Sequence, residues 1–104
     1  MINGYANPGG DAYVTVNGNI LTPDASLKVR NHSPGGFAWG YGGSGPAQLA
    51  LAILLRFCRK EEAERLYQKF KFEVIAALPQ GRDWQMTNTS VHIWLETKRR
   101  EDHG

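Results

Sequence analysis

The first third of the chain has the alternating pattern of a β-hairpin. Residues 12–16 read A-Y-V-T-V, in which apolar and polar side chains alternate as on a half-buried strand. Asn17 and Gly18 follow, and this dipeptide suits the positive φ angles of a type I′ turn. Residues 19–21 are the predicted return strand, and residues 27–30 are a candidate third strand.

The most apolar segment follows a glycine-rich stretch and predicts a helix over residues 46–57. Ser44 or Gly45 can cap it, and Pro46 suits its first turn, where a missing N–H has no cost. The segment is apolar on almost every side. Such a helix is central to a small domain, or one of its faces meets another subunit.

Two later segments have the three- and four-residue spacing of helices with one apolar stripe each. We predict these helices over residues 61–78 and 89–102, with residues 84–86 between them as a short strand or extended segment. Phe72 and Ile75 lie off the first stripe and indicate a second apolar contact. The stripe residues are Ala63, Leu66, Tyr67, Phe70, Val74, Ala77 and Leu78 in one helix and Val91, Trp94 and Leu95 in the other.

Strands followed by helices are typical of the α+β class. We therefore predict a small, mainly antiparallel sheet, built on the N-terminal hairpin and packed against about three helices. A chain of 104 residues has the size of one domain. Residues 1–10, which are rich in Asn, Gly and Pro, are predicted to be a flexible lead-in, and residues 11–104 to be the single domain.

Composition and charge exclude several classes of function. Hydrophobic residues make up 41% of the chain and charged residues 21%, as in ordinary globular domains. The net charge of +2 is too small to indicate a nucleic-acid partner, and the longest apolar run is too short to cross a bilayer. Cys58 is the only cysteine, so no disulfide can form within the chain, and no secretion signal is evident. We expect a cytoplasmic location.

The glycine-rich stretch, residues 31–46, is the most unusual part of the sequence. Its segment G-Y-G-G-S-G, residues 40–45, fits the letters G-x-G-x-x-G. A dinucleotide-binding site needs that pattern within a βαβ unit, and this chain has neither the parallel sheet nor the length for one. A Walker A loop is excluded because no Lys-Ser or Lys-Thr pair follows the glycines.

Two interpretations of this stretch remain open. In one, the glycines only permit a tight connection into the helix, and Phe37 and Trp39 belong to the core. In the other, free backbone N–H groups at the helix N-terminus bind a small anion such as a phosphate, and the aromatic rings stack on a planar ligand. The candidate ligand-binding residues are His32, Trp39, Tyr41, Gly42, Gly43, Ser44 and Gly45.

No set of residues in the sequence predicts catalysis, a metal site or a cofactor. His32, His92 and His103 have no familiar metal-ligand spacing, and Cys58 does not complete one. Ser33 or Ser44 could be combined with His32 and Asp24 into a triad, but no nucleophile-elbow pattern supports this. We therefore expect a protein that is not an enzyme.

The glycine-rich stretch also carries a family resemblance. Residues 31–50 read N-H-S-P-G-G-F-A-W-G-Y-G-G-S-G-P-A-Q-L-A, and the pairs Leu66-Tyr67, Phe70-Lys71 and Trp94-Leu95 follow. Together they resemble the domain of unknown function 6166 family over roughly residues 11–96. The resemblance implies a small stand-alone domain of bacteria, archaea, phages and other mobile elements. It implies no activity and no catalytic residues.

Two functions from different classes follow as expectations. The first is a non-enzymatic accessory protein that acts through a protein partner, for example by inhibiting a host defence system in the host cytoplasm. Apolar and aromatic positions outside the predicted stripes, namely Phe72, Ile75 and Trp84, motivate it. The alternative is a phosphate- or nucleotide-binding module that uses the glycine-rich loop. A homo-oligomer is a further expectation, based on the apolar first helix.

Overall fold

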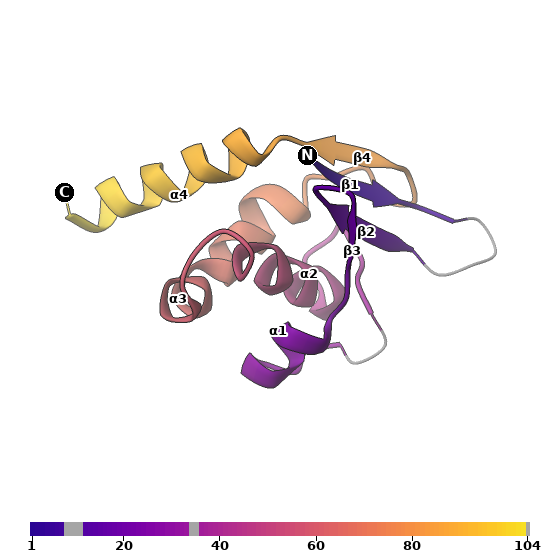
Figure 1. The fold of residues 1–104 in the computed structure, drawn as a ribbon, viewed down its shortest axis with the longest axis horizontal. Coiled ribbons are helices and arrows are strands. Elements are labelled where there is room, and N and C mark those ends of the chain that lie inside the picture. The colour runs from indigo at the N-terminus through magenta and orange to yellow at the C-terminus, as the bar shows by residue number, and fades with distance from the viewer. Residues whose placement is uncertain (8–11, 34–35, 104) are drawn as a thin grey trace.

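The fold is a four-stranded antiparallel sheet with helices packed on one of its faces (Figure 1). The computed structural model describes residues 1–7, 12–33 and 36–103. The strands β1 (Ile2–Tyr5), β2 (Tyr13–Val16), β3 (Asn19–Leu21) and β4 (Trp84–Met86) have the spatial order β3-β2-β1-β4. The predicted α+β class is confirmed.

The hairpin and the short strand at residues 84–86 are confirmed, but the flexible lead-in is wrong where the structure describes it. Asn17 and Gly18 have φ angles of 52° and 85°, as the turn requires. Ile2–Tyr5 is not a lead-in: it is β1, which pairs with both β2 and β4. The strands that pair with β1 are separate segments of the sequence, and the four residues of β1, which include a glycine, carry no local signal for a strand. Residues 8–10 lie outside the described residues.

One face of the sheet is buried and meets the helices. Ile2 and Gly4 in β1 lie opposite Val16 and Val14 in β2, and all four are buried. Gly4 also lies opposite Trp84 of β4, and a Cβ at Gly4 would be 2.2 Å from the indole ring. This strand position therefore requires glycine, because the Trp84 ring occupies the space above it.

Helix α1 (Asp24–Val29) replaces the predicted third strand at residues 27–30. That prediction is wrong because four residues with mixed polarity fit a helix and a strand equally well. Asp24 lies in the first turn, where an acidic side chain is favourable, and Ser26 is buried with its hydroxyl donating to the carbonyl of Pro23 at 2.8 Å.

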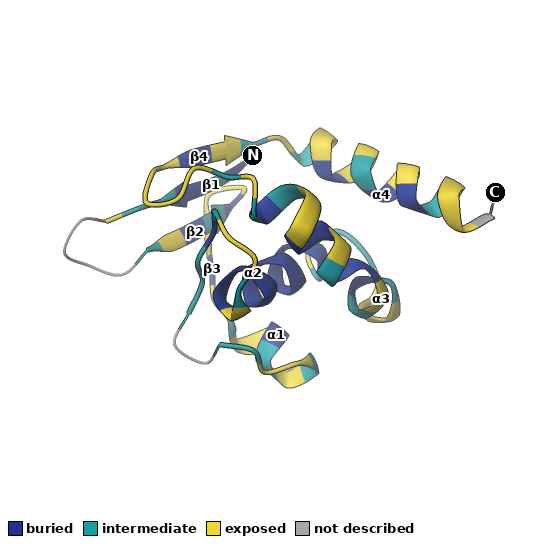
Figure 2. Ribbon diagram, turned by 180° about the vertical axis from the view of Figure 1, so that it is seen from behind, coloured by how far each residue is buried: buried dark blue, intermediate teal, exposed yellow. Residues whose placement is uncertain are grey.

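Helix α2 (Ser44–Leu54) is the central helix, as its sequence predicts. Residues 45–54 are all buried (Figure 2), between α1 on one side and the helical segment after residue 60 on the other. The N-cap is Gly43, without a side-chain hydrogen bond, so the predicted capping by Ser44 or Gly45 is wrong. Because α2 is covered within one chain, it leaves no apolar face for a second copy, and the reason for expecting a homo-oligomer is removed.

The second predicted helix consists of α3 (Lys60–Phe70) and a π-helical turn, η1 (Lys71–Ile75). The amide of Ala76 donates to the carbonyl of Lys71 at 2.8 Å, which is the wider i to i+5 spacing. The turn adds one residue to the stripe, so Ile75 is buried and Val74 is only half-buried. The prediction that Val74 continues the buried stripe and that Ile75 lies off it is therefore wrong.

Helix α4 (Asn88–His103) extends away from the sheet along the top of the molecule in Figure 1. The Thr87 hydroxyl accepts a hydrogen bond from the amide of Ser90 at 3.0 Å and caps the helix start. Val91 and Leu95 are buried, as predicted. Further along, Arg99 donates two hydrogen bonds to the Glu62 carboxylate, at 2.9 and 2.7 Å, which ties α4 to α3.

Replacing Glu62 with glutamine should change how stability depends on pH. The hydrogen bond from Arg99 holds the pKa of Glu62 below its ordinary value of 4.5. A carboxylate with a lowered pKa stabilises the fold above its unfolded-state pKa, and this contribution disappears as the pH falls through the lowered value. We expect the wild-type protein to be more stable than Glu62→Gln at pH 7 and the difference to shrink as the pH falls below 4.5 and through the lowered pKa of Glu62.

Urea unfolding at several pH values measures this difference. Glu61→Gln is the matched control, because Glu61 is exposed in the same helical turn. It should follow the wild-type pH profile. A difference between the wild type and Glu62→Gln that stays constant from neutral to acid pH would contradict the role given to the Arg99 pair.

Candidate functional site

The glycine-rich loop is anchored to the π turn through Gly40. Its amide donates to the carbonyl of Ile75 at 3.0 Å. Gly40 has a φ angle of 85°, and a Cβ there would lie 2.5 Å from the Cβ of Gln80 and 2.6 Å from its Cα. Both the backbone conformation and the close approach require glycine. The site is thus built from two irregular segments, the loop before α2 and the turn after α3.

Three more glycines of the loop make close contacts within the protein. A Cβ at Gly43 would lie 2.4 Å from the Tyr41 ring, and one at Gly45 would lie 2.8 Å from the Cβ of Ala38. A Cβ at Gly42 would lie 3.2 Å from the Phe72 ring. Side chains of this chain therefore occupy the space that each missing Cβ leaves, which gives these glycines a packing role that needs no ligand.

Trp39 is a core residue whose indole N–H group is hydrogen-bonded. Its side chain is 4% exposed and meets Trp84 edge to face, with ring centroids 5.6 Å apart. Its indole N–H donates to the carbonyls of Pro79 and Arg82, each at 3.1 Å. The core interpretation of Trp39 is therefore confirmed.

His32 belongs to a separate hydrogen-bond network centred on Gln48. The Gln48 carbonyl oxygen accepts from the backbone amides of His32 and Ser33 at 2.7 and 3.0 Å. Its Nε2 donates to the hydroxyl of Ser26 at 2.7 Å and to the carbonyl of Arg30 at 3.0 Å. Gln48 is fully buried and uses its amide to fix the end of α1 to α2. The sequence reasoning missed it, although a glutamine within an apolar helix was a signal.

The structure places His32 against Tyr67 and not against a serine. The His32 Nε2 and the Tyr67 hydroxyl are 2.7 Å apart. His92 packs edge to face on Phe57, with ring centroids 5.3 Å apart. Within the described part of the chain, no three His, Cys, Asp or Glu side chains lie close enough together to hold a metal ion. Burial raises the pKa of the Cys58 thiol to about 11, which disfavours the reactive thiolate.

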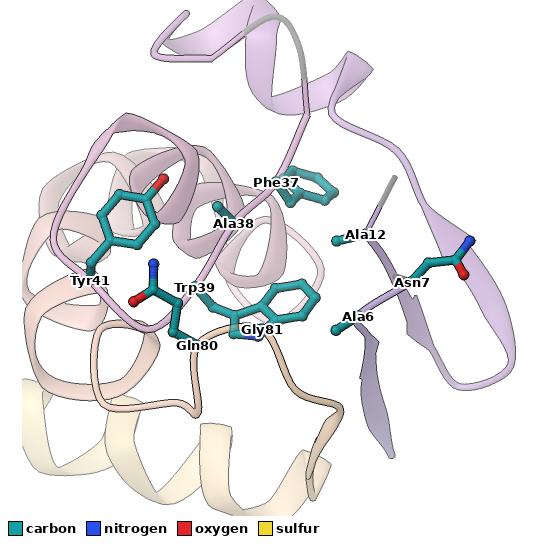
Figure 3. A pocket seen from close by; sticks show the side chains of 9 residues that line it. All are labelled: Ala6, Asn7, Ala12, Phe37, Ala38, Trp39, Tyr41, Gln80 and Gly81. Carbon is teal, nitrogen blue, oxygen red and sulfur yellow. The ribbon is translucent and has the colours of Figure 1, made fainter. Parts of the chain in front are cut away.

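A pocket of about 360 Å³ lies between the glycine-rich loop and the ends of β1 and β2 (Figure 3). Phe37 and Trp39 point towards Ala6 and Ala12, and Tyr41 and Gln80 lie at the other end. Of the candidate ligand-binding residues, only Trp39 and Tyr41 line it among the described residues. None of its described lining residues is charged: they are Ala6, Asn7, Ala12, Phe37, Ala38, Trp39, Tyr41, Gln80 and Gly81.

Beside this pocket the loop and the π turn form an exposed aromatic surface. Tyr41 is 44% exposed and Phe72 is 63% exposed, and Gly42 joins them because it follows Tyr41 and contacts the Phe72 ring. The Lys71 ammonium lies 3.9 Å from the centroid of that ring. We call the surface formed by Tyr41, Gly42, Lys71 and Phe72 the loop–π face.

Sequence reasoning found part of this face. Phe72 was predicted to lie off the core stripe and is exposed. Ile75 and Trp84, which were expected to be available to a partner, are buried, and that expectation is wrong. Lys71 was missed, because nothing in the sequence indicates that this lysine is largely buried beside Phe72.

Comparisons with known proteins identify a family and nothing more specific. No curated protein and no solved structure matches the chain. No helix in the described residues is long and apolar enough to cross a membrane. The profile of a family of unknown function, DUF6166, matches residues 2–97, which is nearly the whole chain and includes the glycine-rich loop, the π turn and all four strands. The chain therefore belongs to the DUF6166 family.

Proposed function

We propose that this chain is a small non-enzymatic accessory protein that binds a protein partner through the loop–π face. The observation that carries the proposal is the exposure of two aromatic side chains, Tyr41 and Phe72, on irregular segments that the core holds in place. Aromatic residues are enriched in protein–protein interfaces and often dominate their binding energy.

Burial of the exposed Phe72 ring by a partner would contribute a sizeable part of the free energy of binding. Burying a whole phenylalanine side chain stabilises a complex by roughly 1.5–3 kcal/mol, and more than half of this one is accessible in the free protein. A Cβ at Gly42 would lie 3.2 Å from the ring, so the Phe72 ring lies beside the glycine-rich loop and a partner that covers it would also meet the loop.

The adjacent pocket suits an apolar side chain of the partner. Its volume of about 360 Å³ is in the range of ligand-binding clefts, and its described walls are mainly aromatic and aliphatic. Asn7, Tyr41 and Gln80 provide a few neutral polar groups at its edge. An apolar side chain seated there would lie next to a surface that also covers Tyr41.

The nucleotide-binding alternative has less support. A phosphate needs cationic or backbone N–H partners, yet the described lining of the pocket beside the loop is uncharged. For the partner we keep the example expected from the sequence, a component of a host defence system, with the protein encoded by a bacterium, phage or mobile element and acting in the host cytoplasm.

Affinity purification of three tagged proteins from a bacterial lysate tests the proposal. They are the wild type, Phe72→Ser and the control Ile93→Ser, whose side chain is 61% exposed on α4. We expect a partner that is recovered equally by the wild type and the control and about tenfold less by Phe72→Ser, since an aromatic interface residue contributes 1.4 kcal/mol or more.

Two outcomes would contradict the proposal. One is a partner whose recovery depends on Ile93 and not on Phe72. The other is the absence of any partner together with a rise in melting temperature on adding a nucleotide or inorganic phosphate. The second outcome would favour the phosphate-binding alternative.

A further inference from the structure

We infer that the loop–π face recognises an acidic–apolar segment, in which a carboxylate side chain lies close to a large apolar one. The carboxylate pairs with Lys71, and the apolar side chain covers Phe72 or enters the pocket. This inference rests on the proposed function and specifies the chemistry of the partner.

Lys71 carries a charge that the described residues do not neutralise. Its side chain is almost buried, at 8% exposure, and the described residues place no carboxylate within ion-pair distance of it. Most of this residue is buried, and the printed contact of its ammonium is with the Phe72 ring and not with a carboxylate. The Phe72 ring offers a cation–π contact of only about 0.5–2 kcal/mol.

Lys98, the other lysine that is nearly buried among the described residues, shows the usual arrangement. Its ammonium lies 2.9 Å from the Glu73 carboxylate and 3.3 Å from that of Glu101. Glu73 is two positions from Lys71 but is already engaged by Lys98 and by the indole N–H of Trp94. The carboxylate nearest in sequence is therefore held towards α4 and leaves Lys71 to an outside partner.

The Lys71 ammonium is accessible to such a partner. Among the described residues, Trp84 Nε1 is the one fully buried side-chain nitrogen or oxygen without a hydrogen bond. The Lys71 ammonium has no hydrogen bond to a described residue either and is not in that class, so it is in contact with solvent. It emerges beside Phe72, which itself lies against Gly42. A carboxylate that approached Lys71 would bring the neighbouring side chains of its own chain over the Phe72 ring and towards the uncharged pocket.

Selection of a random linear peptide library on the full chain tests this inference. We expect the enriched peptides to carry Asp or Glu within a few positions of an aromatic or large aliphatic residue. We expect a selected peptide to bind Lys71→Met about tenfold more weakly than wild type, which corresponds to an ion-pair coupling near 1.4 kcal/mol. The methionine keeps the buried stem of the lysine, and Lys71→Arg, which keeps the charge, should retain the acidic preference.

The controls separate the two proposals. Lys69→Met removes an exposed charge two positions away and should leave the affinity unchanged. Changing the acidic residue of the peptide to its amide should weaken binding to the wild type and have no further effect with Lys71→Met. Peptides that need Phe72 but show no acidic preference would overturn this inference and leave the proposed function standing. Failure to select any peptide that needs Phe72 would overturn both.

Discussion

Replacing Gln48 with leucine should lower the free energy of unfolding by about 2–4 kcal/mol, because partly buried backbone groups lose their partners. The leucine side chain fits a helix that is otherwise apolar, so the loss comes from the hydrogen bonds. The mutation removes the hydrogen bonds that the Gln48 side chain makes with the backbone amides of His32 and Ser33 and with the carbonyl of Arg30. Urea unfolding measures the change.

Gln85→Leu is the control for this prediction. Gln85 is exposed on the edge strand β4, and its replacement should change stability by no more than about 0.5 kcal/mol. If Gln48→Leu were as stable as the wild type, the network would not hold the start of the glycine-rich stretch in place.

Trp39→Ala should destabilise the fold by about 3–5 kcal/mol, the usual cost of removing a buried aromatic side chain. The mutation removes the edge-to-face contact with Trp84 and both hydrogen bonds of the indole N–H. Trp39→Phe should have an intermediate effect, because it keeps a ring but leaves the carbonyls of Pro79 and Arg82 without this donor. Thermal or urea unfolding distinguishes the three proteins.

Tyr41→Ala is the matched test within the same loop. Tyr41 is 44% exposed, so its loss should cost the fold about 1 kcal/mol or less. The two tryptophan variants and this one divide the loop into a residue that stabilises the fold and a residue that faces outwards. Equal stability losses for Trp39→Ala and Tyr41→Ala would contradict that division.

Local signals in the sequence were sufficient for the hairpin and for the central helix. The Asn17-Gly18 turn depends only on its own backbone angles, and the apolar run before Leu54 has to be buried wherever it packs. Strand β1 could not be predicted in this way, because its four residues become a strand only by pairing with β2 and β4.

The site was harder to predict than the fold because it depends on one added residue. The π turn moves Ile75 into the core, whereas regular helical spacing would continue the stripe through Val74. Phe72 is exposed, as regular spacing also predicts. The glycines did mark the site, but their contacts with Ala38, Tyr41 and Phe72 depend on the folded structure.

The central claim is that the loop–π face binds a protein, and photo-crosslinking tests it most directly. A photoreactive phenylalanine analogue would replace Phe72 in one protein and Ile20, 66% exposed on β3, in another. We predict a specific crosslinked partner from position 72 and none from position 20 in the same lysate. A partner crosslinked from position 20 and absent from position 72 would contradict the claim.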